Sequence, residues 1–195
     1  MPSLIDRLRH ALTQPFPQPI AGDNDFNPAE LHPDPVPAAV LVPIVRRSNP
    51  GLILTTRTPH LSKHAGQVAF PGGRVDPTDR SHVAAALREA QEEIGLDPRN
   101  VDVIGESSPY RTATGYAVSP IVGVLSPDLA FTPNPHEVAD LFEVPLDYVL
   151  NPANHQSRET LWEGRLRRYW AIPWQQRMIW GATAGMLVNL ARRLG

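Results

Sequence analysis

Apolar residues follow two spacings along the chain, one typical of strands and one typical of helices. Short apolar or alternating runs predict strands at residues 38–45, 52–56, 67–70, 101–104, 116–125, 160–162 and 166–172. Helical spacing predicts a first helix at residues 4–12, a second at 83–94, a short piece after 146 and a long helix that closes the chain. Strands and helices intermix without a βαβ repeat, which favours an α/β fold with a mixed sheet between helices.

Length and turn-forming residues indicate how the chain is divided. Residues 14–36 are rich in Pro, Asp and Asn and are expected to be loop. A chain of 195 residues fits one domain with a full core. We therefore expect a single domain over 1–195, in which a helix and Pro-rich loop (1–36) precede the core and closing helix (37–195). The first helix is amphipathic and is expected to pack either on this domain or on a second copy, as a homodimer.

Composition excludes several classes of function. The formal net charge is −2, and a protein that binds nucleic acid or a membrane surface broadly would need a basic stripe. The absence of cysteine excludes disulfides and thiolate metal sites and suits the reducing cytoplasm. The longest apolar stretch, 178–190, falls short of the roughly twenty residues that span a bilayer. We expect a cytoplasmic protein with a small-molecule substrate.

Three carboxylates stand close together on the second predicted helix. Glu89, Glu92 and Glu93 are spaced by three and four residues, so their side chains converge and repel one another by a few tenths of a kcal/mol per pair. A hard divalent cation, which prefers oxygen ligands, would neutralise them. The alternative is an ordinary solvated, Glu-rich helix face.

The surroundings of the carboxylates favour the metal interpretation. An apolar stripe on the opposite side of the helix has the spacing of a buried face, which would direct the carboxylates outward. The stripe consists of Val83, Leu87, Ala90 and Ile94. Arg88 lies four residues before Glu92 and can brace it. Gly72 and Gly73 precede the helix and would let the backbone approach a phosphate closely.

The string Arg88–Gly95, which reads REAQEEIG, resembles the signature of the Nudix hydrolases without departure. The front half departs, because Asp79 stands six residues after Gly73 but nine before Arg88. The resemblance implies an α/β/α sandwich and a Mg²⁺- or Mn²⁺-dependent pyrophosphohydrolase. It implies Glu89 and Glu93 as metal ligands, and Glu92 as a third ligand or a general base.

Other residues take roles through the same resemblance. Arg88 would orient a carboxylate within the catalytic set. The general base could instead come from a later loop, where Glu137 is the best candidate. His64 and His136 are further titratable groups.

The segment upstream resembles the extra motif of the coenzyme A pyrophosphatase branch of that family. Residues 53–58, Gly66 and 70–73 keep the intervals of the motif. Ser62 stands where the branch carries a basic residue, with Lys63 beside it. The run 180–185 is similar to the closing helix of bacterial members of the branch. The expected substrate-binding residues are Arg57, Lys63, Gly72 and Gly73.

The two resemblances together imply hydrolysis of the pyrophosphate linkage of coenzyme A and its derivatives, giving 4′-phosphopantetheine and adenosine 3′,5′-bisphosphate. One alternative is the same chemistry on another nucleoside diphosphate, such as ADP-ribose or NADH, which the serine at position 62 favours. Another is a Nudix-fold binding module without catalysis, which the three retained glutamates disfavour.

Overall fold

The computed structural model of the chain describes all residues except 1, 17–18, 21, 23–31, 60–65 and 163. Its main elements, in chain order, are α1 (Leu4–Thr13), β1 (Val36–Val45), β2 (Gly51–Arg57), β3 (Val68–Ala69), β4 (Gly72–Arg74), α2 (His82–Ile94), β5 (Val101–Glu106), β6 (Tyr110–Arg111), β7 (Tyr116–Leu125), β8 (Val138–Pro145), α3 (Leu146–Leu150), β9 (Gln156–Trp162), β10 (Arg165–Trp174), β11 (Arg177–Trp180) and α4 (Ala182–Arg193). Short 3₁₀ turns lie at Pro98–Asn100 and Pro152–Asn154. The predicted mixed α/β fold is confirmed.

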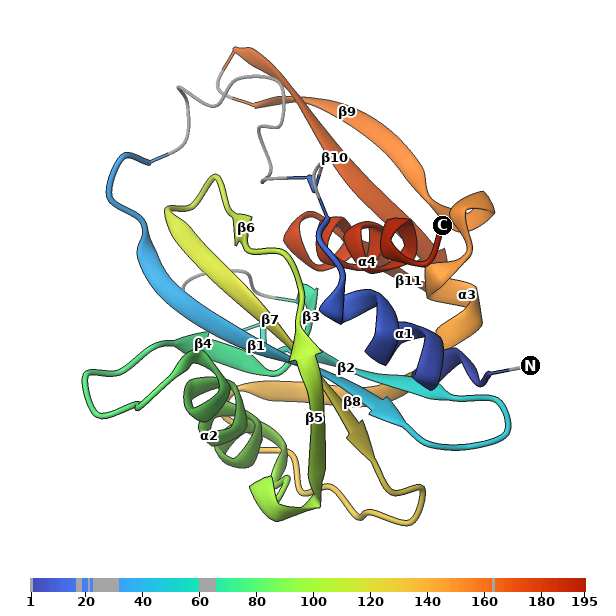
Figure 1. The fold of residues 1–195 in the computed structure, drawn as a ribbon. Coiled ribbons are helices and arrows are strands. Elements are labelled where there is room, and N and C mark those ends of the chain that lie inside the picture. Colours follow the sequence, from blue (N-terminus) through green and yellow to red (C-terminus); the bar gives the residue numbers. More distant parts are fainter. Residues whose placement is uncertain (1, 17–18, 21, 23–31, 60–65, 163) are drawn as a thin grey trace.

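Among the described residues, the strands form an eight-stranded sheet and a three-stranded sheet. The path of the large sheet is β3-β2-β1-β7-β5, with β4 on β1, β6 on β7 and β8 on β2. Strands β1 and β7 run parallel over their whole length, whereas the other pairs of the large sheet are antiparallel. The small sheet orders β11-β10-β9 and stands beside α4 (Figure 1).

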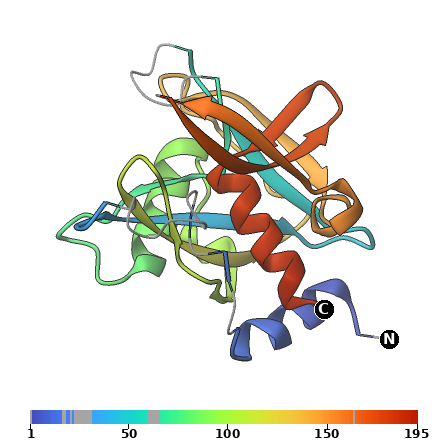
Figure 2. The same cartoon turned by 90° about the horizontal axis from the view of Figure 1, so that it is seen from above.

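The central strand β1 explains the layered architecture. Its residues Ala38, Val42 and Ile44 belong to the core on the side of α1 and α4, whereas Ala39 and Leu41 belong to the core beneath α2. Because side chains alternate between the faces of a strand, a strand buried on both faces must be apolar throughout. Strand β1, with its continuous apolar run, therefore lies in the middle layer of an α/β/α sandwich (Figures 1 and 2).

Both predicted terminal helices form, but the closing helix starts later than expected. Trp180 is the last residue of strand β11, where it pairs with Ala171 of β10, and Gly181 caps α4. The interpretation that the run 180–185 is helical from its first residue was therefore wrong. Pairing with β10 overrides helical spacing there, and the positive φ of Gly181 (62°) makes the turn between strand and helix.

The two terminal helices are tied to each other and to the sheet. Leu8 of α1 is fully buried, so this helix packs on its own chain. Asn189, in the middle of the apolar α4, accepts a hydrogen bond from the backbone N–H of Ile20 (2.8 Å) and donates one to its C=O (3.0 Å). The Arg193 guanidinium donates to the carbonyls of Ala11 and Gln14, each at 3.2 Å.

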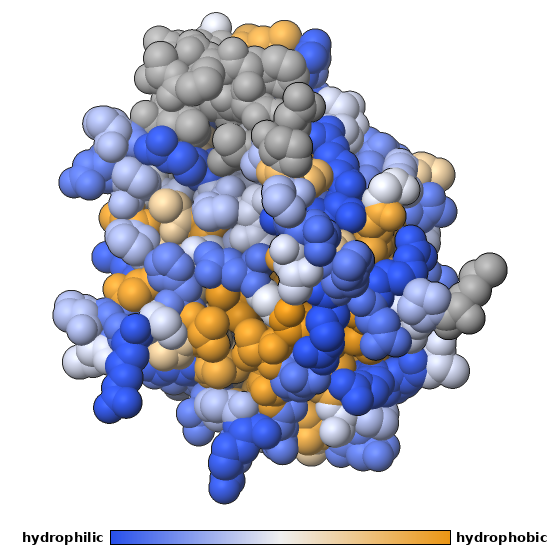
Figure 3. Space-filling model, viewed as in Figure 1, coloured by the Kyte–Doolittle hydropathy of each residue, from blue (hydrophilic) through white to orange (hydrophobic). Residues whose placement is uncertain are grey.

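The outer surface of this arrangement is mixed in character. Apolar residues on one face gather in its middle, between α1 and α2, and polar residues surround them (Figure 3). Within the described part of the chain, no helix combines the length and apolar character needed to cross a membrane.

Candidate active site

Helix α2 is fixed at both ends by local chemistry. The Ser81 side chain accepts a hydrogen bond from the Ala84 N–H (3.1 Å), and Gly95 ends the helix in the left-handed conformation (φ 69°). Ala90 and Ile94 are fully buried against the sheet, as the apolar stripe predicts. The helix is therefore rigidly placed, and so are the backbone positions of its three glutamates.

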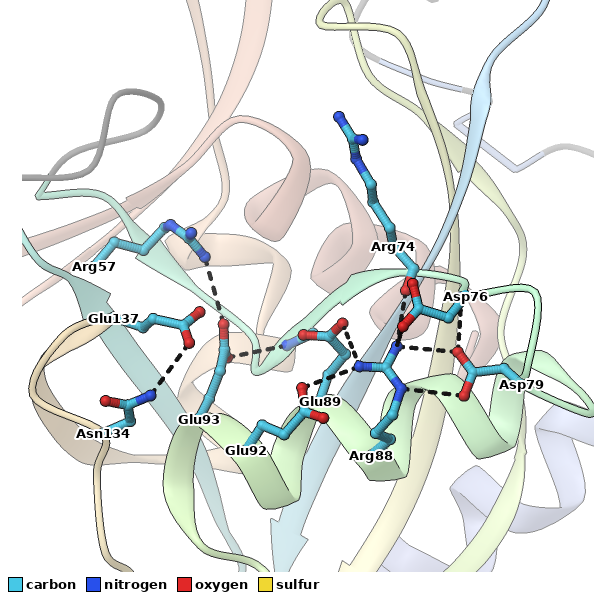
Figure 4. A network of polar contacts seen from close by, with 11 residues as sticks. Arg57, Arg74, Asp76, Asp79, Arg88, Glu89, Glu92, Glu93, Asn134 and Glu137 are labelled. Atoms are coloured by element: carbon cyan, nitrogen blue, oxygen red, sulfur yellow. Dashed lines mark hydrogen bonds and ion pairs between the residues drawn. The ribbon is translucent and has the colours of Figure 1, made fainter.

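The three glutamates differ sharply in exposure. The side chain of Glu92 is 55% exposed, that of Glu89 is 16% exposed and that of Glu93 only 4%. The expectation that all three lie on an outward face was wrong for Glu93. This glutamate lies on the flank of the helix that faces β4 and the loop before it, whose backbone covers it (Figure 4).

The two glycines that precede the helix allow this close approach. A Cβ on Gly73 would stand 2.5 Å from the Glu89 carboxyl carbon, and one on Gly72 would stand 2.5 Å from the Ala39 carbonyl oxygen. The Gly72 N–H also donates to Glu93 Oε2 at 3.2 Å. The structure therefore brings both predicted glycines against the carboxylates.

Arg88 connects the glycine loop to the carboxylates. Its Nε and Nη2 donate to the two oxygens of Asp79 (3.1 and 3.0 Å), and Nη1 donates to Glu89 (2.9 Å) and Glu92 (3.0 Å). Nη2 also reaches the Arg74 carbonyl oxygen (3.0 Å). A guanidinium has five N–H donors, and these five contacts occupy them all. Arg88 thus orients carboxylates, and its hydrogen bonds lower the pKa of Asp79.

Asp79 itself was the ambiguous position of the sequence motif. Despite its shifted spacing, it reaches the same arginine as the helix carboxylates, and its side chain is 6% exposed. Its contacts with Arg88 are bidentate, so it holds the loop to the helix.

Burial controls the charge of the two inner carboxylates. Burial raises the pKa of Glu93 to about 7, against the opposing effects of Arg57 and the Gly72 N–H. Burial also raises the pKa of Glu89, and the hydrogen bond from Arg88 partly offsets this. Arg57 Nη1 lies 3.5 Å from Glu93 Oε1. Arg57, expected to contact substrate, is thus paired with a glutamate here.

The loop before β8 brings Glu137 to the same place. Asn134 donates from its side chain to Glu137 Oε1 (3.2 Å), and its own N–H binds the Glu93 carbonyl (2.8 Å). The Thr58 N–H binds the Glu137 carbonyl (3.0 Å), which fixes the loop to β2. Figure 4 shows the Glu137 carboxylate directed toward Glu93 and Arg57. Sequence reasoning missed Asn134, whose only signal is its place three residues before Glu137.

Other candidate residues lie elsewhere or outside the description. Lys63, Ser62 and His64 fall outside the described residues. His136 is exposed, and its N–H binds Asn134 Oδ1 (3.1 Å).

The chemistry of the donors fits a hard divalent cation shared with a substrate. Within the described residues, no group of three His, Asp or Glu side chains is placed to hold an ion alone. Mg²⁺ commonly uses one or two carboxylates, with substrate phosphates and water as the remaining ligands. Glu89 and Glu93 offer two such carboxylates, both poorly solvated. They repel each other, and a bound cation would offset that repulsion.

The fold and the site together define a class of protein: a mixed α/β sandwich with an arginine-braced carboxylate cluster on a helix after a glycine loop. The chain belongs to the Nudix family, since the model of the NUDIX domain matches residues 35–163. A protein of Escherichia coli (strain K12) called "uncharacterized Nudix hydrolase NudL" is 49% identical over 158 residues, covering 81% of this chain and 82% of that protein.

Solved structures with a similar fold include two that are 20% identical to this chain. An Ap4A hydrolase of C. elegans in a binary complex has a TM-score of 0.47 and covers 57% of this chain and 81% of its own. The NUDIX domain of Shewanella oneidensis NrtR, complexed with ADP ribose, has a TM-score of 0.46 and covers 64% of this chain and 81% of its own.

Proposed function

We propose that this Nudix protein hydrolyses the pyrophosphate linkage of coenzyme A and its derivatives, releasing 4′-phosphopantetheine and adenosine 3′,5′-bisphosphate. The observation that carries the hydrolase chemistry is the pair of poorly solvated carboxylates, Glu89 and Glu93, held against Gly72 and Gly73. The upstream motif, with Arg57 inside it, supports coenzyme A as the substrate.

Different residues of the site would bind the metal ion and orient the carboxylates. Glu89 and Glu93 would hold Mg²⁺ or Mn²⁺, which when bound polarises the phosphoryl group and lowers the pKa of coordinated water. Arg88 fixes Glu89 and Glu92 through short hydrogen bonds, so their oxygens need little reorganisation during the reaction. Gly73 lets the loop backbone lie against the Glu89 carboxyl, because a Cβ there would stand 2.5 Å from the carboxyl carbon.

Two carboxylates are candidates for the general base. Glu137 is oriented by Asn134 and directed toward the carboxylate pair, whereas Glu92 is exposed and held by Arg88. A base must lie within hydrogen-bond reach of the water it activates. Glu137 faces the side of the site on which Arg57 lies, where a substrate phosphate would bind, and we therefore favour it.

A second candidate function is the same hydrolysis on another nucleoside diphosphate, such as ADP-ribose or NADH. The serine at position 62, where the coenzyme A branch carries a basic residue, favours it. A binding module without catalysis is disfavoured because Glu89, Glu92 and Glu93 are all present.

Product analysis by mass spectrometry tests the proposal. Purified protein is incubated separately with coenzyme A, ADP-ribose and NADH, each with Mg²⁺, with Mn²⁺ and with chelator. We expect metal-dependent release of 4′-phosphopantetheine from coenzyme A. Cleavage of the other two compounds alone would refute the substrate assignment while retaining the chemistry. Activity in Glu93→Gln equal to the wild type would refute the metal site.

The base is assigned by comparing Glu137→Gln with Glu92→Gln under saturating metal. Loss of general-base catalysis lowers kcat by about 10²- to 10⁴-fold. We expect that loss in Glu137→Gln, with a smaller one in Glu92→Gln. The reverse order would assign the base to the helix.

A further inference from the structure

Arg57 holds an unusual position between the sheet and the catalytic helix. Its backbone is fixed to the segment just before β3, since its N–H binds the Gln67 carbonyl (3.0 Å) and its own carbonyl accepts from Gly66 (3.1 Å). Its side chain, 26% exposed, leaves β2 and crosses to Glu93 of α2 (Figure 4). The guanidinium can therefore change partners while the backbone stays in place.

The contact between Arg57 and Glu93 leaves both groups only partly satisfied. At 3.5 Å it is an ion pair without the short hydrogen bonds that Arg88 makes on the same helix. Arg57 Nε is buried and has no hydrogen-bond partner among the described residues. A guanidinium with unused donors beside a carboxylate site is suited to receive phosphate oxygens.

The Glu93 carboxylate cannot pair with the Arg57 guanidinium and bind a divalent metal ion equally well at the same time. Its Oε2 accepts from the Gly72 N–H, so Oε1, the oxygen that faces Arg57, is the one with a free side. A divalent cation bound there would repel the guanidinium at close range, in a site where burial weakens solvent screening.

We propose that Arg57 is the countercharge of Glu93 before metal binds, and that metal binding releases it to the diphosphate of the substrate. The inference rests on Glu93 as the metal ligand of the proposed function, but not on coenzyme A as the substrate. Metal and diphosphate then favour each other's binding through this exchange of partners, in addition to any direct contact between them. Because linkage is reciprocal, each raises the affinity for the other by the same factor.

If Arg57 exchanges partners in this way, its removal has an effect that would not be expected if Arg57 only bound the substrate. Without any phosphate ligand, removing the competing guanidinium should tighten metal binding. Coupled sites in proteins typically interact by about 5- to 150-fold. The pair is long and Arg57 is partly exposed, so we expect the low end, about fivefold tighter binding of Mn²⁺ by Arg57→Gln.

The test is a titration of the substrate-free protein with Mn²⁺ at pH 8.5, above the pKa of about 7 of Glu93, with free ion measured by electron paramagnetic resonance. Arg57→Lys, which keeps a cation, should bind Mn²⁺ within about twofold of the wild type. Arg57→Met is measured beside Arg57→Gln, so that the result does not depend on one variant folding. Arg47→Gln is the matched control, because it breaks an Arg–Glu pair, with Glu143, outside the cluster.

Steady-state kinetics of hydrolysis are a second measurement, and they use whichever diphosphate substrate the protein cleaves. In Arg57→Gln, KM for the substrate should rise, and the metal concentration for half-maximal rate should depend less on substrate concentration than in the wild type. Mn²⁺ binding no tighter in Arg57→Gln and Arg57→Met than in Arg47→Gln would overturn the exchange. Failure to cleave coenzyme A would not affect the Mn²⁺ titration, so the two proposals fail separately.

Discussion

Replacing Glu93 with glutamine should stabilise the metal-free protein at neutral and alkaline pH, although it removes a proposed ligand. The pKa of Glu93 is raised from 4.5 to about 7 because the carboxyl is buried. The folded chain therefore holds a proton between these values that the unfolded chain has released. Stability from this group is complete below about pH 4.5 and is lost as pH rises through about 7.

The size of the effect follows from the same two values. One pKa unit corresponds to about 1.4 kcal/mol, so ionised Glu93 costs the folded state at most about 3 kcal/mol. Glutamine carries no charge and can still accept the Gly72 N–H, but it leaves Arg57 unpaired and buries an amide. We therefore expect Glu93→Gln to raise the free energy of unfolding by about 1–3 kcal/mol at pH 8.

Urea unfolding in chelator at several pH values between 4.5 and 8 measures this difference. The gain of Glu93→Gln over the wild type should vanish near pH 4.5 and grow steadily toward pH 8. Glu92→Gln, at an exposed position of the same helix, should show no comparable growth. A difference independent of pH, or a less stable Glu93→Gln at pH 8, would refute the reasoning. Adding Mn²⁺ should stabilise the wild type more than the variant.

Three further changes test other parts of the structure. Arg88→Lys keeps the charge but loses the bidentate contact with Asp79, so we expect kcat to fall by about 10-fold or more in steady-state assays, with KM little changed. Gly73→Ala places a methyl group against the Glu89 carboxyl, and should weaken Mn²⁺ binding by about 10-fold in a direct titration. Asn189→Ala leaves backbone groups before β1 without partners, and should cost about 1–3 kcal/mol in urea unfolding without a matching loss of kcat.

Helix α2 could be predicted from sequence because its signals are local. The cap at Ser81, the stop at Gly95 and the apolar spacing between them lie within fifteen residues of one another. The central strands β1, β2 and β7 were predictable for a similar reason, since each carries its own apolar run. The strands β4 (Gly-Gly-Arg) and β6 (Tyr-Arg) carry none, and they and β8 were not predicted. The choice of partners among the strands was not, because register depends on surfaces that meet only in the folded chain.

The burial of Glu93 could not be read from the helix alone. Spacing placed it with Glu89 and Glu92, but its cover comes from Gly72 and its countercharge from Arg57, both outside the helix. The raised pKa is therefore a tertiary property. Trp180 illustrates the same limit, because its strand conformation depends on pairing with a neighbour in the small sheet.

The link between Ile20 and Asn189 has a consequence for synthesis of the protein on the ribosome. The two residues are 169 positions apart, and elongation at about 5–20 residues per second separates them by roughly ten to thirty seconds. Throughout that interval α1 lacks α4, one of the two elements it packs against, whereas the other, β5, is made long before α4. The packing of α1 is therefore completed only after the last helix of the chain has been synthesised.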